Sequence, residues 1–182
     1  MINPFTIAIA SILGLMSMSG RKDNTMVRPP KPDFVRNRQI VRAEAVRQGV
    51  PVEVALATVR LESNFDSSAK GDLNWHKTAR FEKNVPKDSP FRGQPELWHS
   101  YGLFQLLAPY HVTGTEDPRI LFDPNINTER GVAYLRRLLL ANHGDLDSAR
   151  LQYTGAHRAD AQTQIKVLAK WANALAAERA LL

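Results

Sequence analysis

The chain contains no cysteine. It therefore has no disulfide framework, no thiolate nucleophile and no zinc–thiolate site, and cysteine usage leaves the redox compartment open. None of its five histidines stands at a metal-ligand spacing such as His-x-x-x-His. Internal repeats, low-complexity tracts and runs with strand periodicity are also missing. We expect neither a metal nor a cofactor, and we expect a mainly helical fold.

The remaining composition is that of one domain. A chain of 182 residues with 43% hydrophobic residues can bury one sizeable core but scarcely two. The net charge of +6 favours an anionic partner, such as peptidoglycan stem peptides, lipid headgroups or nucleic acid. The basic clusters Arg36-Asn37-Arg38 and Arg136-Arg137 lie on segments whose other faces are apolar, which is typical of solvated helix faces. No nucleic-acid-binding module is visible.

Residues 1–20 form a separate hydrophobic segment, with no charged side chain between Ile2 and Gly20. As a helix the segment would extend about 28 Å, just enough to span a membrane. A secretory signal is the rival interpretation, but basic residues should precede a signal core, whereas Arg21 and Lys22 follow this one. By the positive-inside rule, those two residues would hold the domain that follows in the cytoplasm.

Residues 21–32, which end in Pro29-Pro30-Lys31-Pro32, predict an extended tether, and residues 33–182 predict one helical domain. The first predicted helices cover about Phe34–Gln48, which ends at Gly49, and Pro51–Ser63, and a short helix over about Tyr101–Leu107 stops before Pro109. Asn127 is predicted to cap a fourth helix, and Leu146, Ala149 and Tyr153 share a face of a fifth. The last predicted helix places Ile165, Leu168, Trp171 and Leu175 in the core.

Glu62 is the most informative residue of the second predicted helix. Helical spacing sets Val52, Ala55, Leu56 and Val59 on one apolar face and brings Glu62 to its edge. A carboxyl group in that position loses hydration, and burial disfavours its charged form. A general acid that works near neutral pH requires this environment, although most helical glutamates are solvated surface charges.

Further runs follow Glu62-Ser63-Asn64-Phe65 in a fixed order. They are Ser100-Tyr101-Gly102-Leu103-Phe104-Gln105, Leu121-Phe122-Asp123-Pro124, Asn127-Thr128-Glu129-Arg130-Gly131-Val132-Ala133-Tyr134-Leu135 and Leu151-Gln152-Tyr153-Thr154-Gly155. Together these runs resemble the soluble lytic transglycosylase (SLT) family, lysozyme-like domains that cleave the glycan strands of bacterial peptidoglycan. The resemblance covers about residues 35–175 and implies a fold like that of goose-type lysozyme.

The chain departs from the family pattern at two motifs and in one segment. Phe104 stands where the family usually has methionine, and Thr154-Gly155-Ala156 replaces the usual Asn-Ala-Gly. The separation of Glu62 from Gln105 is long for the family, and the excess falls in residues 70–99. This segment predicts an ordered loop insertion or a small subdomain, in which a hairpin is conceivable. Its aromatic residues could line a sugar cleft or form a core of their own; they are Trp75, Phe81, Phe91 and Trp98.

The resemblance implies a mechanism in which one carboxyl group acts twice. Glu62 would protonate the glycosidic oxygen between N-acetylmuramic acid and N-acetylglucosamine, and would then accept the proton of the muramoyl C6 hydroxyl as a 1,6-anhydro ring closes. Tyr153 would orient the acid as the second catalytic residue. The substrate-binding residues implied are Ser63, Tyr101, Gly102 and Gln105, of which Gln105 would bind an N-acetyl group, whereas Asn127 and Gly131 look structural.

Two other functions stay open at this point. A lysozyme-type muramidase on the same fold would need a second carboxylate, for which Asp66 and Asp72 are the nearest candidates, although Asp66 more plausibly caps a turn. A catalytically inactive glycan-binding or virion structural protein would keep the fold without cleavage.

The charges that flank the hydrophobic segment bear on localisation. An enzyme that meets peptidoglycan without an ordinary export signal fits a phage virion protein that is packaged in the particle and ejected into the cell envelope during delivery of the phage genome. Residues 1–20 would then enter a membrane or pack against neighbouring virion proteins. A cleaved or membrane-anchored cell-wall enzyme that faces the periplasm is the competing hypothesis.

Overall fold

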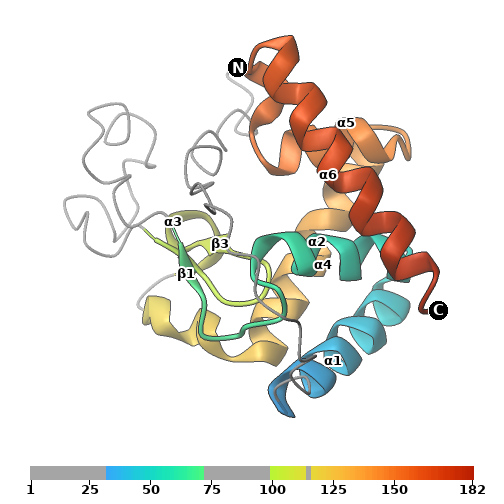
Figure 1. Ribbon diagram of the computed structural model, residues 1–182. Coiled ribbons are helices and arrows are strands. Elements are labelled where there is room, and N and C mark those ends of the chain that lie inside the picture. The colour runs from blue at the N-terminus through green and yellow to red at the C-terminus, as the bar shows by residue number, and fades with distance from the viewer. Residues whose placement is uncertain (1–31, 72–98, 114–115) are drawn as a thin grey trace, which may run out of the picture.

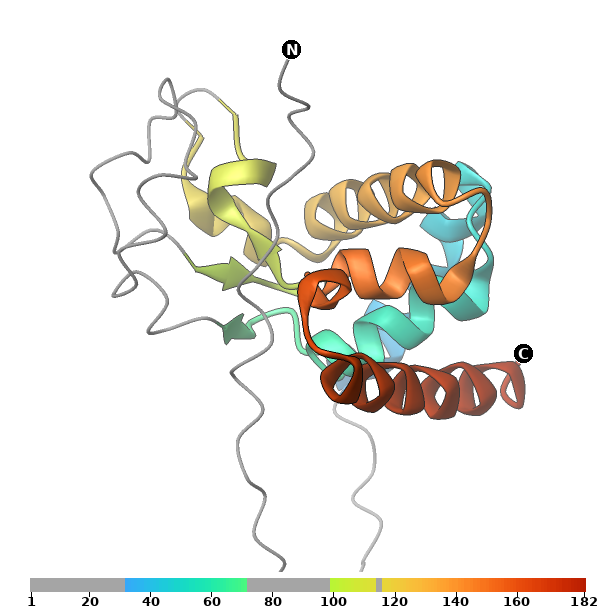
Figure 2. The same ribbon diagram turned by 90° about the horizontal axis from the view of Figure 1, so that it is seen from above.

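The domain carries its long helices on one side and a small sheet on the other (Figure 1 and Figure 2). The computed structural model describes residues 32–71, 99–113 and 116–182. Within these ranges no helix is long and apolar enough to cross a membrane. The hydrophobic segment, the tether up to Lys31 and the four aromatic residues of the predicted insertion lie outside the described residues.

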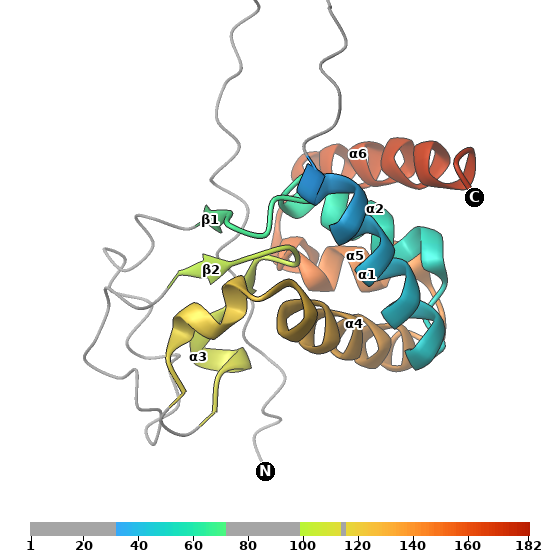
Figure 3. The ribbon, with the colours of Figure 1, turned by 90° about the horizontal axis from the view of Figure 1, so that it is seen from below.

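Two helices open the domain and are joined by a left-handed glycine. Helix α1 spans Pro32–Gln48 and helix α2 spans Val52–Glu62. Gly49 ends α1 with a φ of +69°, a conformation that costs glycine little because it has no Cβ. Both helices confirm the prediction, although Pro51 is the N-cap of α2 and not its first residue. Helix α2 packs against α1, as seen from below in Figure 3.

The other long helices are α4 over Pro124–Ala141, α5 over Leu146–Tyr153 and α6 over Ala161–Arg179. Each follows an aspartate whose carboxylate accepts hydrogen bonds from backbone N–H groups in the first turn; these caps are Asp123, Asp145 and Asp160. Helix α6 packs on α2, and α5 packs on α4 and α6. The three caps fix where the elements that surround α2 begin.

Asn127 does not cap α4, and that prediction is wrong. Oδ1 of Asp123 accepts hydrogen bonds from the backbone nitrogens of Asn125 and Ile126 at 2.8 and 3.1 Å. Asn127 lies inside α4 and is fully buried. Its amide is therefore available for contacts with other elements.

A three-stranded antiparallel sheet has the strand order β1-β2-β3. The strands are β1 over Lys70–Gly71, β2 over Ser100–Tyr101 and β3 over Leu106–Leu107. The short elements are the helix α3 over Ala108–His111 and the 3₁₀ helices η3 over Pro118–Phe122 and η4 over Ala156–Arg158. The pairing of β2 with β3 thus holds the turn between these two strands.

The predicted helix over residues 101–107 is wrong, because this stretch is a hairpin. Gly102 and Gln105 have φ values of +70° and +48°, and a right-handed helix cannot pass through such residues. The helix α3 starts only after the hairpin, with Pro109 in its first turn, where proline is tolerated.

One hydrophobic core lies between the helices and the sheet. Its largest fully buried apolar side chains are Trp171, Phe65, Phe104, Leu56, Leu103, Leu106, Leu121, Val41, Val54 and Val59. The prediction of core positions in the last helix holds for Trp171 and Leu175, and Leu168 packs against the core. It is wrong for Ile165, whose exposed fraction is 59%.

Glu178 holds the end of α6 against α1 and α2. Its side chain is 0% exposed, its Oε1 accepts a hydrogen bond from Arg60 Nε at 2.6 Å, and its Oε2 pairs with Arg38. A buried carboxylate is tolerated only when cations and hydrogen bonds replace its lost hydration.

We predict that Glu178→Ala lowers the free energy of unfolding by about 3 kcal/mol, because two arginines lose their buried counter-charge while keeping partial access to solvent. Urea denaturation of both proteins measures the difference. Glu129→Ala is the matched control, because Glu129 is 65% exposed and lies 3.8 Å from Arg47. Equal midpoints for the two variants would contradict the prediction.

Candidate active site

Glu62 is the last residue of α2, and its side chain meets a cation from α5. The side chain is only 13% exposed, and its Oε1 lies 2.8 Å from Nη1 of Arg150, which is 8% exposed. The geometry is that of an ion pair, since Nη1 does not align as a hydrogen-bond donor. Sequence reasoning placed Glu62 at the edge of the apolar face and missed Arg150.

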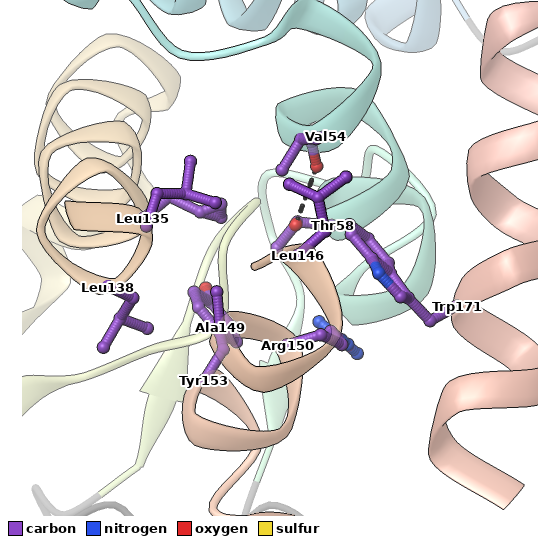
Figure 4. A pocket seen from close by; sticks show the side chains of 10 residues that line it. Val54, Thr58, Leu135, Leu138, Leu146, Ala149, Arg150, Tyr153 and Trp171 are labelled. Atoms are coloured by element: carbon purple, nitrogen blue, oxygen red, sulfur yellow. Dashed lines mark hydrogen bonds between the residues drawn. The ribbon is translucent and has the colours of Figure 1, made fainter. Parts of the chain in front are cut away.

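Arg150 lies between two aromatic rings. Its Cζ is 5.6 Å from the ring centre of Tyr153 and 5.5 Å from that of Trp171. Figure 4 shows Arg150 and Tyr153 on α5, with Trp171 on α6. Aromatic faces attract a cation, and the attraction strengthens when the cation is desolvated. The two rings and Glu62 therefore compensate for burying the guanidinium.

Tyr153 binds the main chain near Glu62 and does not donate to the carboxylate. Its hydroxyl donates to the carbonyl oxygen of Phe104 at 2.5 Å. Burial raises the pKa of Tyr153 well above its ordinary value of 10.0, and the charge of Glu62 raises it further, whereas Arg150 lowers it. The hydroxyl thus keeps its one hydrogen, and that hydrogen is used at Phe104. The hydroxyl donates elsewhere, and the role predicted for Tyr153, orienting the acid, stays a prediction.

The segment Tyr101–Gln105, which we call the site turn, receives side chains from three helices. Ser63, directly after α2, donates from Oγ to the carbonyl oxygen of Leu103 at 2.8 Å. Tyr153 of α5 binds the next carbonyl, that of Phe104. Asn127 of α4 accepts from Phe104 N and donates to the carbonyl oxygens of Tyr101 and Leu121, each at 2.8 Å. The structural role predicted for Asn127 is confirmed.

Two glycines are required by close packing around the site turn. A Cβ on Gly102 would lie 2.3 Å from Leu121 O and 2.5 Å from Asn127 Nδ2. A Cβ on Gly131 would lie 2.2 Å from Cγ of Phe104. Gly131 is therefore structural, as predicted. Gly102 was predicted to bind substrate, which stays a prediction; in the structure its missing side chain makes room for Asn127.

Gln105 is bound within the protein. Its Nε2 donates to the carbonyl oxygens of Ala69 and Gly102 at 3.1 and 2.9 Å, and its Oε1 accepts from Ser100 Oγ at 3.0 Å. Both amide hydrogens are used, so an N-acetyl group could reach only the remaining lone pair of Oε1. The substrate contact predicted for Gln105 stays a prediction, and its observed contacts join the site turn to β2 and to Ala69, the residue before β1.

Tyr101 is buried at the base of the site turn. Its exposed fraction is 3%, and its ring packs edge-to-face on Phe122 with centroids 5.1 Å apart. Lys70 Nζ lies 5.5 Å from the ring centre. Burial raises the pKa of Tyr101. The observed contacts support the hairpin, and substrate binding by Tyr101 and Ser63 stays a prediction.

A row of aromatic rings continues from Tyr153 away from Glu62. The ring centres of Tyr153 and Tyr134 are 5.3 Å apart, and those of Tyr134 and His111 are 5.1 Å apart. Burial and the positive charges of Arg137 and Arg130 lower the pKa of His111 to about 3. His111 is therefore neutral near pH 7, a property that could not be predicted from its place in the sequence.

The helices enclose a small cavity behind Arg150 and Tyr153 (Figure 4). Its volume is about 10 Å³, room for roughly one water molecule, so a saccharide ring cannot occupy it. Among the described residues no group of three or more histidine, aspartate or glutamate side chains is placed to hold a metal ion.

Of the two candidates for a second carboxylate, Asp66 serves a turn. Its Oδ1 accepts hydrogen bonds from the backbone N and the Oγ of Ser68 at 2.9 and 2.6 Å, and Asp66 is exposed. The turn-capping role predicted for Asp66 is confirmed. Asp72 lies outside the described residues.

The fold and the site define a mainly helical, lysozyme-like domain with an enclosed glutamate at the end of a core helix. The model of the transglycosylase SLT domain family matches residues 39–172, and the chain belongs to this family. Membership supports peptidoglycan as the substrate and a lytic transglycosylase type of activity in general. No curated protein and no solved structure matches the chain.

We predict that Gly102→Ala destabilises the protein more than Gly49→Ala does. Both glycines have a positive φ, +70° and +69°, so the backbone strain of the two substitutions is matched. Only at Gly102 does the new Cβ clash, because nothing lies within 4 Å at Gly49. Thermal unfolding should show an additional cost of about 1–3 kcal/mol for Gly102→Ala. Equal costs would mean that the site turn is loosely packed.

We also predict that His111 makes stability depend on pH. Folding lowers the pKa of His111 from 6.5 to about 3. Between these two pH values the imidazole binds a proton in the unfolded chain but not in the folded chain. The free energy of unfolding therefore falls as the pH is lowered from about 6.5 toward 3. Urea denaturation at a series of pH values should show a shallower fall for His111→Gln. The control is His143→Gln, at an exposed position, and an identical slope for His111→Gln and wild type would refute the prediction.

Proposed function

We propose that this protein is a peptidoglycan lytic transglycosylase that cleaves the bond between N-acetylmuramic acid and N-acetylglucosamine, with Glu62 as its single catalytic carboxyl group. Membership of the transglycosylase SLT domain family supports the substrate and the general type of reaction. The observation that carries the assignment to Glu62 is its position, because the 13% exposed carboxyl group ends α2 between Arg150 and the site turn.

The proposed reaction uses the carboxyl group of Glu62 twice, first as an acid and then as a base. Protonated Glu62 gives its proton to the glycosidic oxygen, the bond from C1 of the muramoyl residue to that oxygen breaks, and the N-acetylglucosamine side leaves as an alcohol. The muramoyl C6 oxygen then bonds to C1, and the Glu62 carboxylate takes the C6 hydroxyl proton. The products contain the same atoms as the substrate, so no water is consumed.

The surroundings of Glu62 supply rigidity for both steps. Ser63 ties the end of α2 to Leu103, and Tyr153 ties α5 to Phe104. Residues held by packing and by hydrogen bonds from neighbouring elements keep a catalytic group in its productive geometry. The hydrogen bonds of Asp66 within its own turn argue against one of the two candidates for the second carboxylate that a hydrolase of this kind uses.

A peptidoglycan substrate supports action at the bacterial cell envelope, which is part of the proposal. Delivery within a phage virion and anchoring in a membrane through residues 1–20 stay predictions, because that segment lies outside the described residues.

The test incubates the full-length protein with purified peptidoglycan and analyses the soluble fragments by mass spectrometry. Wild type should release muropeptides one water lighter than reducing muropeptides, and Glu62→Gln should reduce their formation at least about a hundredfold, the lower limit for loss of a general acid. The control is Glu53→Gln, on the same helix, whose carboxylate lies 3.7 Å from Arg179.

Each of the other outcomes would assign a different function or mechanism. Reducing ends would mean a muramidase with a second carboxylate. Absence of products from wild type, with binding to peptidoglycan unchanged in Glu62→Gln, would mean a glycan-binding or virion structural protein. Full activity of Glu62→Gln would remove Glu62 from the mechanism.

A further inference from the structure

Arg150 is a buried cation whose position needs an explanation. It is 8% exposed, and its Nε and Nη1 have no hydrogen-bond partner within the described residues. Burying a guanidinium is costly unless nearby groups offset its charge. The groups that do so are the Glu62 carboxylate at 2.8 Å and the faces of Tyr153 and Trp171.

The ion pair of Glu62 differs from the ion pairs of Glu178. Glu178 is 0% exposed, and its two carboxylate oxygens are occupied by Arg60 and Arg38. Glu62 keeps an exposed fraction of 13%, and its Oε1 is paired, whereas Oε2 makes no hydrogen bond or ion pair with the described part of the chain. Arg150 thus occupies one oxygen of the carboxyl group and leaves the other for another partner.

We infer that Arg150 is a positioning residue for the proposed reaction: it binds Oε1 of Glu62, directs Oε2 toward the glycosidic oxygen and stabilises the carboxylate that remains after proton transfer. This inference rests on the proposed function. Proton donation leaves a negative charge in an enclosed site, where a fixed cation lowers the energy of the charge without reorganisation. The aromatic rings on either side of Arg150 keep the guanidinium in place.

Arg150 is the charged side chain that α5 turns toward Glu62, and Tyr153 on the same helix is neutral because its pKa is raised. Trp171, on α6, carries no charge. The neighbouring charges Arg60 and Glu178 are paired with each other. Arg150 is therefore the cation beside the negative charge that proton transfer leaves on Glu62, and its removal should slow the reaction.

The test measures kcat and KM of the full-length protein on soluble glycan strands of defined length. Arg150→Met should lower kcat roughly tenfold to a hundredfold with little change in KM, because a charge that acts in the transition state is lost. Arg150→Lys keeps the positive charge and should recover part of kcat.

Circular dichroism and thermal unfolding establish whether each variant is folded. If Arg150→Met does not fold, Arg150→Gln replaces it, with the same expected fall in kcat. Failure of both neutral variants to fold would mean a purely structural ion pair and would overturn the inference. Folded neutral variants with the kcat of wild type would also overturn it. Wild type without glycan cleavage would instead overturn the proposed function itself, and the inference with it.

Discussion

The buried side chain of Asn127 is the contact on which the arrangement around Glu62 depends. Its amide meets one backbone nitrogen and two carbonyl oxygens, and so joins α4 to η3 and to the site turn. Backbone groups of a tight turn in the core need such partners, because an unpaired one would carry its full desolvation cost. With the turn fixed, its Leu103 and Phe104 carbonyls are presented to Ser63 and Tyr153. Three helices thereby meet at one short piece of main chain.

Glu178 and Glu62 are both enclosed carboxylates whose buried charge must be compensated, and the two are compensated in different ways. At Glu178 both oxygens are paired with arginines from other helices, which holds the last helix to the first two. At Glu62 a single arginine pairs with one oxygen, and the group retains a little exposure. Pairing both oxygens serves stability, because each oxygen of the buried carboxylate then faces a counter-charge. At Glu62 the second oxygen is left for a substrate. The aromatic faces of Tyr153 and Trp171 help to stabilise the buried charge of Arg150, which has only this one carboxylate oxygen as a counter-charge.

Helical spacing predicted the helical class, the approximate bounds of α1, α2 and α5, and the place of Glu62 beside the apolar core. It failed for residues 101–107, because their apolar residues suit a helix whereas Gly102 and Gln105 take a left-handed backbone that the hairpin imposes. It could not find the pair of Glu62 and Arg150, since charges far apart in sequence meet only through packing. A signal was nevertheless present, because Arg150 lies three residues before Tyr153 and so shares its helix face.

The contact between Phe104 and Gly131 ties two positions of the chain to each other. The family usually has methionine where this chain has Phe104, and methionine is a flexible side chain that fills irregular gaps. A phenyl ring is rigid, and here it occupies the volume in which the Cβ of residue 131 would stand. The two positions consequently cannot vary independently. A larger residue at position 131 becomes tolerable only in a background where position 104 has first been made smaller or more flexible, so the order of changes decides which sequences this fold can reach.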